Sequence, residues 1–140
     1  MICKGTIEEA YGVFIEVPEL DRGLSLGEFK SKAPAGALVL LCRVEEKSVG
    51  FKIGYPISEN EFYSWLGGVL PEYREQGVAQ QLLDSQERWV RNQGYTKISV
   101  KSMNRYSSMI RFLVKNGYQI VKVGRFGTKD ERIHFQKSLA

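Results

Sequence analysis

The sequence has few of the residues that build disulfide frameworks or metal sites, and no apolar stretch long enough to cross a membrane. Its 140 residues include two cysteines and one histidine. Cys3 and Cys42 make no disulfide framework and have no metal-binding neighbours, so we expect reduced thiols and no bound metal. No apolar run approaches the roughly 18 residues of a membrane-spanning helix. The N-terminus lacks a signal peptide's apolar core, so we expect a cytoplasmic protein without a membrane partner.

Composition is typical of a globular protein, with 43% apolar and 26% charged residues. The length suits one domain, and no low-complexity segment or internal boundary appears. We therefore expect a single domain over residues 1–140.

Charge is distributed unevenly along the chain. The net charge of +4 is made up of −3 on residues 1–70 and +7 on residues 71–140. A basic second half suits an anionic ligand. Nucleic acid would also fit, but the Lys and Arg residues are scattered without a recognised motif, so we do not expect it as the partner.

Apolar periodicity and turn residues predict helices alternating with short strands. Helices are expected from Thr6 to just before Pro18, and over residues 25–32, 78–93 and 105–115. Strands are expected over residues 37–44, 49–57, 61–70, 96–101, 118–124 and 132–137. Short joints between the first three strands indicate an antiparallel meander, whereas the strand–helix–strand unit through residues 62–100 should be parallel. The predicted fold class is mixed α/β, of α+β type, with one twisted, mostly antiparallel sheet of about six to seven strands flanked by helices.

The turn at residues 69–80 is the strongest candidate for a ligand site. Pro71 ends a strand, and a helix starts near Gly77. The first N–H groups of a helix have no partner within it, and with the helix dipole they favour an anion such as phosphate. Gly77 and Ala79 let a ligand approach the backbone, and Arg74 adds a permanent positive charge. An ordinary strand-to-helix turn remains the alternative.

The spacing Arg74-x-x-Gly77-x-Ala79, after Val-x-Pro-x-Tyr and before two leucines, resembles the pyrophosphate signature of the GNAT superfamily of acetyl-coenzyme A-dependent N-acyltransferases. The resemblance covers about residues 37–137. It implies a GNAT-like sheet in which a parallel strand pair splays at a cleft for acetyl-CoA. The implied coenzyme-binding residues are Gly68, Val69 and Leu70 for the pantetheine arm, Arg74, Glu75, Gln76, Gly77, Val78, Ala79 and Gln80 for the pyrophosphate, and Asn104 for the pantetheine. Asn104 is also a good helix N-cap, and both roles can hold.

The catalytic groups are less defined than the coenzyme site. Many members of the family carry a tyrosine acid where this chain has Leu113, so a tyrosine general acid is not expected. Tyr63 and Glu61 are the candidates for the base that deprotonates an amine; the alternatives are a strand aromatic and a solvated edge charge. His134 is interpreted as structural.

The resemblance implies an N-acetyltransferase that moves the acetyl group of acetyl-CoA to a primary amine by direct attack in a ternary complex. The alternative is a coenzyme A-binding sensor or regulatory module of the same fold. The acceptor would be a small-molecule or peptide amine, and the acidic first half is compatible with a cationic one. Dimers are frequent in such families, so a homodimer is retained as an alternative to a monomer.

Overall fold

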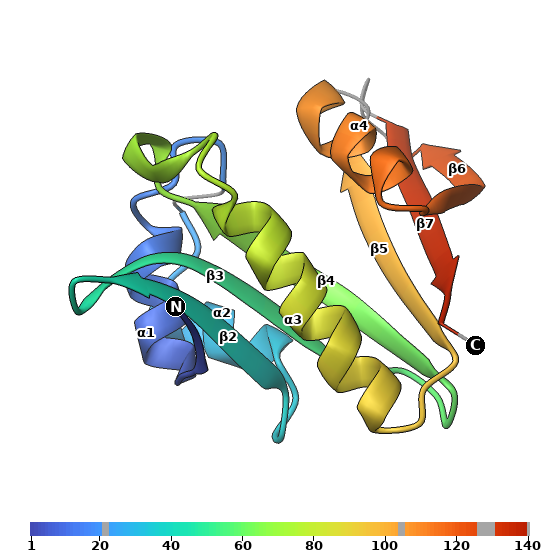
Figure 1. The fold of residues 1–140 in the computed structure, drawn as a ribbon, viewed down its shortest axis with the longest axis horizontal. Helices are drawn as coiled ribbons and strands as arrows, with labels where there is room; N and C mark the ends of the chain where they lie inside the picture. Colours follow the sequence, from blue (N-terminus) through green and yellow to red (C-terminus); the bar gives the residue numbers. More distant parts are fainter. Residues whose placement is uncertain (21–22, 104–105, 126–130, 140) are drawn as a thin grey trace. The chain divides into compact units, whose positions relative to one another are not determined.

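The computed structural model describes residues 1–20, 23–103, 106–125 and 131–139. Their strands form one seven-stranded sheet in the order β1-β2-β3-β4-β5-β7-β6 (Figure 1). The strands are β1 (Ile2–Lys4), β2 (Leu38–Val44), β3 (Lys47–Pro56), β4 (Glu61–Val69), β5 (Lys97–Met103), β6 (Gln119–Arg125) and β7 (Glu131–Ser138). The helices are α1 (Ile7–Phe14), α2 (Leu26–Lys32), the 3₁₀ turn η1 (Pro71–Tyr73), α3 (Val78–Asn92) and α4 (Ser107–Lys115).

The predicted fold class is confirmed. Strands β4 and β5 pair in parallel from Glu61–Lys97 to Ser64–Val100, whereas β1–β2, β2–β3, β5–β7 and β6–β7 are antiparallel. The parallel register ends at Ser64, although β4 continues to Val69.

Strand β1 was missing from the sequence prediction, and that part of the prediction is wrong. Ile2 pairs with Cys42 and Lys4 with Leu40, so β1 adds an edge to the sheet beside β2. Three residues are too few for an alternating pattern to be recognised. The strand exists because a distant partner satisfies its backbone, which local sequence does not reveal.

Contacts between Cα atoms divide the chain into two compact units. Unit 1 comprises Met1–Tyr55 and Trp65–Trp89, and unit 2 comprises Pro56–Ser64 and Val90–Ala140. The chain therefore passes between the units near the end of β3, within β4 and within α3. The expectation of a single domain remains a prediction.

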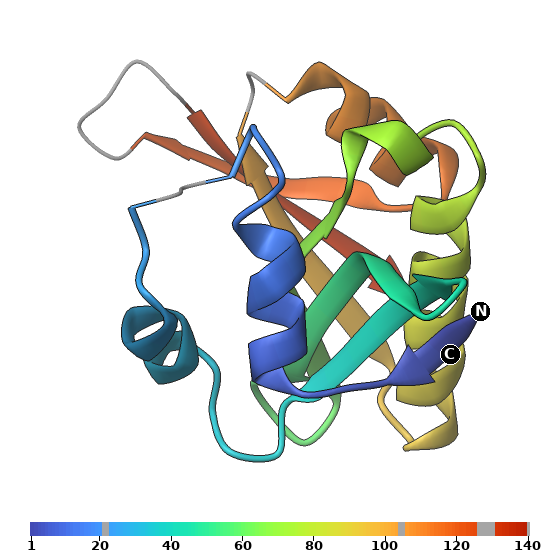
Figure 2. The same ribbon diagram turned by 90° about the vertical axis from the view of Figure 1, so that its left-hand side faces the viewer.

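In unit 1, helices cover both faces of β2 and β3. Gly50 faces α3, because a Cβ atom at this position would lie 2.9 Å from a Val78 methyl carbon. The next residue, Phe51, points the other way and packs edge-on against Phe14 of α1, with ring centroids 6.5 Å apart. Figures 1 and 2 show α1 and α3 on opposite sides of these strands. The alternation of side chains along β3 thus supplies two apolar layers.

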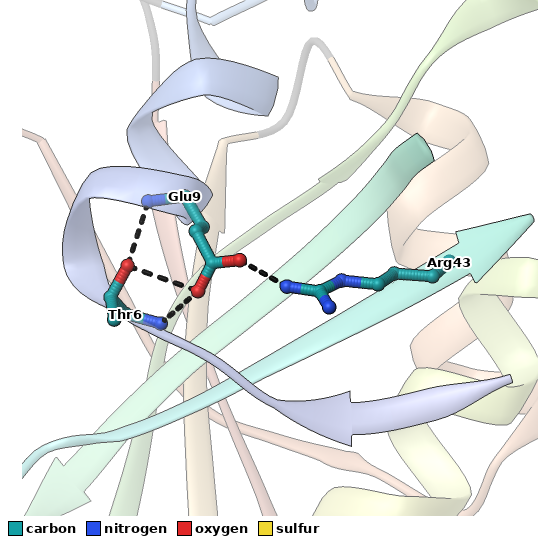
Figure 3. Close-up of polar contacts among 3 residues, drawn as sticks. All are labelled: Thr6, Glu9 and Arg43. Carbon is teal, nitrogen blue, oxygen red and sulfur yellow. Dashed lines mark hydrogen bonds and ion pairs between the residues drawn. The ribbon is translucent and has the colours of Figure 1, made fainter. Parts of the chain in front are cut away.

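Both N-terminal helices begin with a complete capping box. The Thr6 hydroxyl accepts from the Glu9 amide while the Glu9 carboxylate accepts from the Thr6 amide, and Ser25 and Glu28 repeat this arrangement. Glu9 also forms an ion pair with Arg43 of β2, which ties α1 to the sheet (Figure 3). These caps explain why α1 and α2 start where the sequence predicts.

In unit 2, α4 lies against one face of β5, β7 and β6. That face carries Ile98 and Phe135, which are fully buried, and Leu113 is the buried residue of the helix. Met109 of the same helix is 38% exposed. None of the helices among the described residues is both long enough and apolar enough for a membrane span.

Candidate functional site

In the turn between β4 and α3, residues with a left-handed backbone alternate with residues of ordinary conformation. Glu75 and Gly77 have φ angles of 61° and 81°, and both lie in the left-handed region. A non-glycine residue there costs on the order of 1–3 kcal/mol, and such strain is concentrated at ligand sites. Left-handed residues next to ordinary ones turn successive N–H groups toward one side, which makes an anion-binding concavity. The strained backbone therefore supports the ligand-site interpretation over an ordinary turn.

Several consecutive N–H groups of this loop have no acceptor among the described residues. The first intrahelical bond of α3 runs from the Gln81 amide to the Gly77 carbonyl at 3.0 Å. Within the described part of the chain, the amides of residues 75–79 make no hydrogen bond. A Cβ atom at Gly77 would meet only the Gln81 side chain, at 4.0 Å, so the space beside this backbone is open. Open amides at a helix N-terminus fit a diphosphate.

Arg74 stabilises the loop through its side-chain contacts and also places a positive charge beside it. Its Nε donates to the Val69 carbonyl at 3.2 Å, and its Nη2 forms an ion pair with Glu19 at 2.7 Å. Gln76 reinforces the turn, because its side-chain amide donates to the Glu72 carbonyl at 3.1 Å. The positive charge of Arg74 therefore lies beside the site and is also paired with the Glu19 carboxylate. Glu19 had no sequence signal linking it to this turn.

The end of β4 is shaped by packing within unit 1. A Cβ atom at Gly68 would lie 3.2 Å from carbons of both Val17 and Leu20, so this glycine is needed for close packing. The Leu70 amide donates to the Val49 carbonyl at 2.9 Å, and the Leu70 side chain is buried. The segment expected to hold the pantetheine arm, Gly68 to Leu70, therefore leads directly into the loop at the end of β4. Asn104 lies outside the described residues.

The two candidate bases lie in unit 2, at alternate positions of β4. Glu61 is in parallel register with Lys97, and Tyr63 is in register with Ser99. Both candidates are half-buried. The ammonium group of Lys101 lies 5.2 Å from the centre of the Tyr63 ring, a cation–π geometry.

Helix α3 also carries buried polar groups that the sequence interpretation missed. Gln86 and Glu87 are buried, and neither amide atom of Gln86 has a hydrogen-bond partner among the described residues. Lys52 lies on the α3 face of β3; it is half-buried as a residue, with its ammonium group buried. Burial lowers the pKa of Lys52 to about 8, opposed by the charge of Glu87. The sequence did indicate that Gln86 and Glu87 face the core, because they follow Leu82 and Leu83 by four residues and so share their face of the helix.

No metal centre is present in the part of the chain that the structure describes. His, Cys, Asp and Glu side chains do not gather there into a group of three that could hold an ion. Cys3 and Cys42 are free thiols.

Comparisons with known proteins bear on the family and the fold. The sequence model of the acetyltransferase (GNAT) family matches residues 6–118. No curated protein sequence matches the chain.

Solved structures share the fold at low sequence identity. The ribosomal-protein-S18-alanine N-acetyltransferase from Escherichia coli superposes with a TM-score of 0.88 and 16% identity, covering 100% of this chain and 94% of that one. Ard1 from Thermoplasma volcanium gives 0.83 and 18%, over 100% and 97% of the two chains. A GNAT family acetyltransferase from Elizabethkingia anophelis with acetyl-CoA bound gives 0.81 and 14%, over 99% and 97%. At these identities, the similarity shows the fold.

Proposed function

Because this chain belongs to the GNAT acetyltransferase family, we propose that it transfers the acetyl group of acetyl-CoA to a primary amine of a small molecule or peptide. The observation that carries the proposal is the run of open amides at residues 75–79 beside the left-handed Gly77. We propose further that both units belong to one acetyltransferase domain. A cytoplasmic location is part of the same proposal, since the free thiols Cys3 and Cys42 suit a reducing compartment.

Acetyl-CoA, when bound, supplies an acyl thioester with a thiolate leaving group. The chain's own contribution begins with the open loop amides of residues 75–79, which would hold the diphosphate. The backbone of Gly68 and Val69 and the side chain of Asn104 would hold the pantetheine arm. Arg74 keeps the loop in shape through the Val69 carbonyl. This anchoring would supply the proximity on which a direct attack depends.

The amine must lose a proton before it attacks, and Tyr63 or Glu61 would accept it. Tyr63 is the candidate followed below, because its ring contacts the ammonium group of Lys101. Leu113, at the position where the family often has a tyrosine acid, is 1% exposed and cannot donate a proton. Water or a backbone N–H would then stabilise the leaving thiolate.

Calorimetric titration with acetyl-CoA is the direct test. The wild-type protein should bind, whereas Gly77→Val should lose at least tenfold in affinity because its side chain would occupy the open side of the loop and disfavour the positive φ. Gly36→Val is the matched control, since Gly36 also has a positive φ, 83°, and lies in open space away from the loop. No binding at millimolar acetyl-CoA would refute the proposal.

The buried Leu113 also favours a second candidate, a coenzyme A-binding sensor module without turnover. Thiol release measured across a panel of primary amines separates the two. Turnover with any amine removes the sensor, whereas tight binding without turnover across the panel supports it.

A further inference from the structure

Three cationic or titratable side chains form one row across the sheet of unit 2. Lys101 on β5 is in register with His134 on β7, and His134 is in register with Lys122 on β6. Side chains of residues that pair across a sheet point to the same face. We call Lys101, His134 and Lys122 the basic row. Tyr63 adjoins its β5 end, because the Lys101 ammonium lies over the Tyr63 ring.

The basic row lies on the face of this sheet opposite α4. Val100 and Phe135, each one residue away from a member of the row, face the helix and are buried. Lys101 and Lys122 are exposed, and Arg132 lies two residues from His134 on the same face of β7. The basic row is therefore a polar surface, whereas the opposite face of the same strands is apolar and buried.

The cations of the row are not neutralised within the described structure. Among the described residues, no ion pair is found for Lys101, His134 or Lys122. The Nε2 atom of His134 is buried and has no hydrogen-bond partner there. The pKa of His134 is lowered by its burial and then by Lys101, Lys122 and Arg132, so all of these charges act on the same point.

The charge of the whole unit reinforces this local field. Its two segments carry 11 Lys and Arg residues against 4 Asp and Glu residues, whereas unit 1 carries 9 against 12. Like charges placed opposite each other on a sheet destabilise it. Despite this cost, several positive charges lie around one histidine, and such a concentration of charge is expected at a site that binds an anion.

We propose that the basic row binds an anionic group, a carboxylate or a phosphate, on the acceptor molecule whose amine is acetylated. The inference rests on the proposed function, in which Tyr63 receives the proton of the acceptor amine. An acceptor with its amine at Tyr63 has its neighbouring groups within reach of Lys101. The substrate class is then an amine that carries a negative charge, in contrast to the cationic acceptor with which the acidic first half of the sequence is compatible.

The single histidine allows a direct test of the anion site. The imidazole resonance of His134, followed by NMR against pH, reports the charge around it without assignment ambiguity. Inorganic phosphate or succinate, compared with chloride at equal ionic strength, should raise the pKa of His134 saturably. Lys122→Gln should raise that pKa at the outset and weaken the response at least fivefold. Lys115→Gln removes one exposed charge from α4 and should leave the response unchanged.

Acceptor pairs then link the site to catalysis. Ethanolamine phosphate is compared with ethanolamine, and β-alanine with β-alaninamide, in thiol-release assays with acetyl-CoA. The anionic member should have a kcat/KM at least about tenfold higher, mainly through KM, and Lys122→Gln should reduce this preference to near unity. Lys122 is preferred over Lys101 for this test because the Tyr63 contact belongs to Lys101.

The outcomes separate the two proposals. Failure to bind acetyl-CoA refutes the proposed function, whereas the NMR titration still decides whether the row binds anions. Turnover without any preference for the anionic member, or a response of His134 that Lys122→Gln leaves intact, overturns the inference. A short mixed-sequence RNA that shifts His134 while phosphate and succinate do not would also overturn it, in favour of a polynucleotide surface.

Discussion

The buried ammonium of Lys52 makes the stability of the protein depend on pH in the alkaline range. In the folded protein, burial lowers the pKa of Lys52 to about 8 from an ordinary value of 10.5, with Glu87 acting in the opposite direction. Between these two pH values the unfolded chain binds one more proton than the folded chain. The free energy of unfolding therefore rises with pH across this window.

The size of the effect follows from the two pKa values. Their separation of about 2.5 corresponds to about 3 kcal/mol, because one pKa unit is worth about 1.4 kcal/mol. Below pH 8 the folded protein carries this cost in full, since both states are protonated there. Lys52→Met keeps the length of the side chain and removes the ionisable group. The difference in unfolding free energy, wild type minus Lys52→Met, should rise by about 3 kcal/mol from pH 7.5 to 10.5.

Urea unfolding followed by tryptophan fluorescence at half-unit steps over this range gives the difference directly. Groups that titrate identically in the two proteins cancel in the subtraction. Lys32→Met is the matched control, because Lys32 is exposed on α2, and its difference should stay flat. A flat difference for Lys52→Met as well would mean that its ammonium remains hydrated in the folded state, and the argument from burial would be wrong.

Three further substitutions test the packing, the loop and the caps. Gly50→Ala places a Cβ atom 2.9 Å from a Val78 methyl carbon, so unfolding in urea should show a loss of about 1–3 kcal/mol; a loss under 0.5 kcal/mol would contradict the close approach of α3. Gly77→Ala has open space but a φ of 81°, so thermal unfolding should show a loss of about 1–2 kcal/mol from backbone strain alone, and no loss would mean that the turn relaxes. Thr6→Ala removes the hydroxyl that caps α1 and should cost about 1 kcal/mol in the same assay, whereas Thr6→Ser should cost much less; equal losses would assign the effect to the methyl group.

Local signals were sufficient where the structure depends on neighbours in the sequence. The capping residues Thr6 and Ser25 located the first two helices, and Gly77 located the turn before α3. The family resemblance was found in the same turn, because small residues are required beside open amides and therefore occur at a fixed spacing, Arg74-x-x-Gly77-x-Ala79. The candidate coenzyme site was therefore assigned from one stretch of sequence, and that assignment stays a prediction. The Arg74–Glu19 ion pair was not anticipated, because it joins distant segments.

Features that depend on strand register could not be predicted. The basic row exists because β5, β7 and β6 align Lys101, His134 and Lys122, residues that are far apart in the chain. The register between β6 and β7 also shifts between Ile120 and Lys122, and this irregularity brings Lys122 rather than its neighbour opposite His134. A slip of one residue would reverse the face of every side chain in the strand. His134 consequently had the appearance of an isolated structural histidine in the sequence.

The chain passes between its two compact units three times, at Tyr55–Pro56 near the end of β3, at Ser64–Trp65 in β4 and at Trp89–Val90 in α3. A protease that needs an extended, solvent-accessible peptide finds no such segment at the crossings in β4 and α3. Dissection into independently expressed halves would cut a strand and a helix, and each fragment would retain a frayed end in place of a surface loop. Deletion analysis of this protein should therefore be replaced by point substitutions, which leave both shared elements continuous.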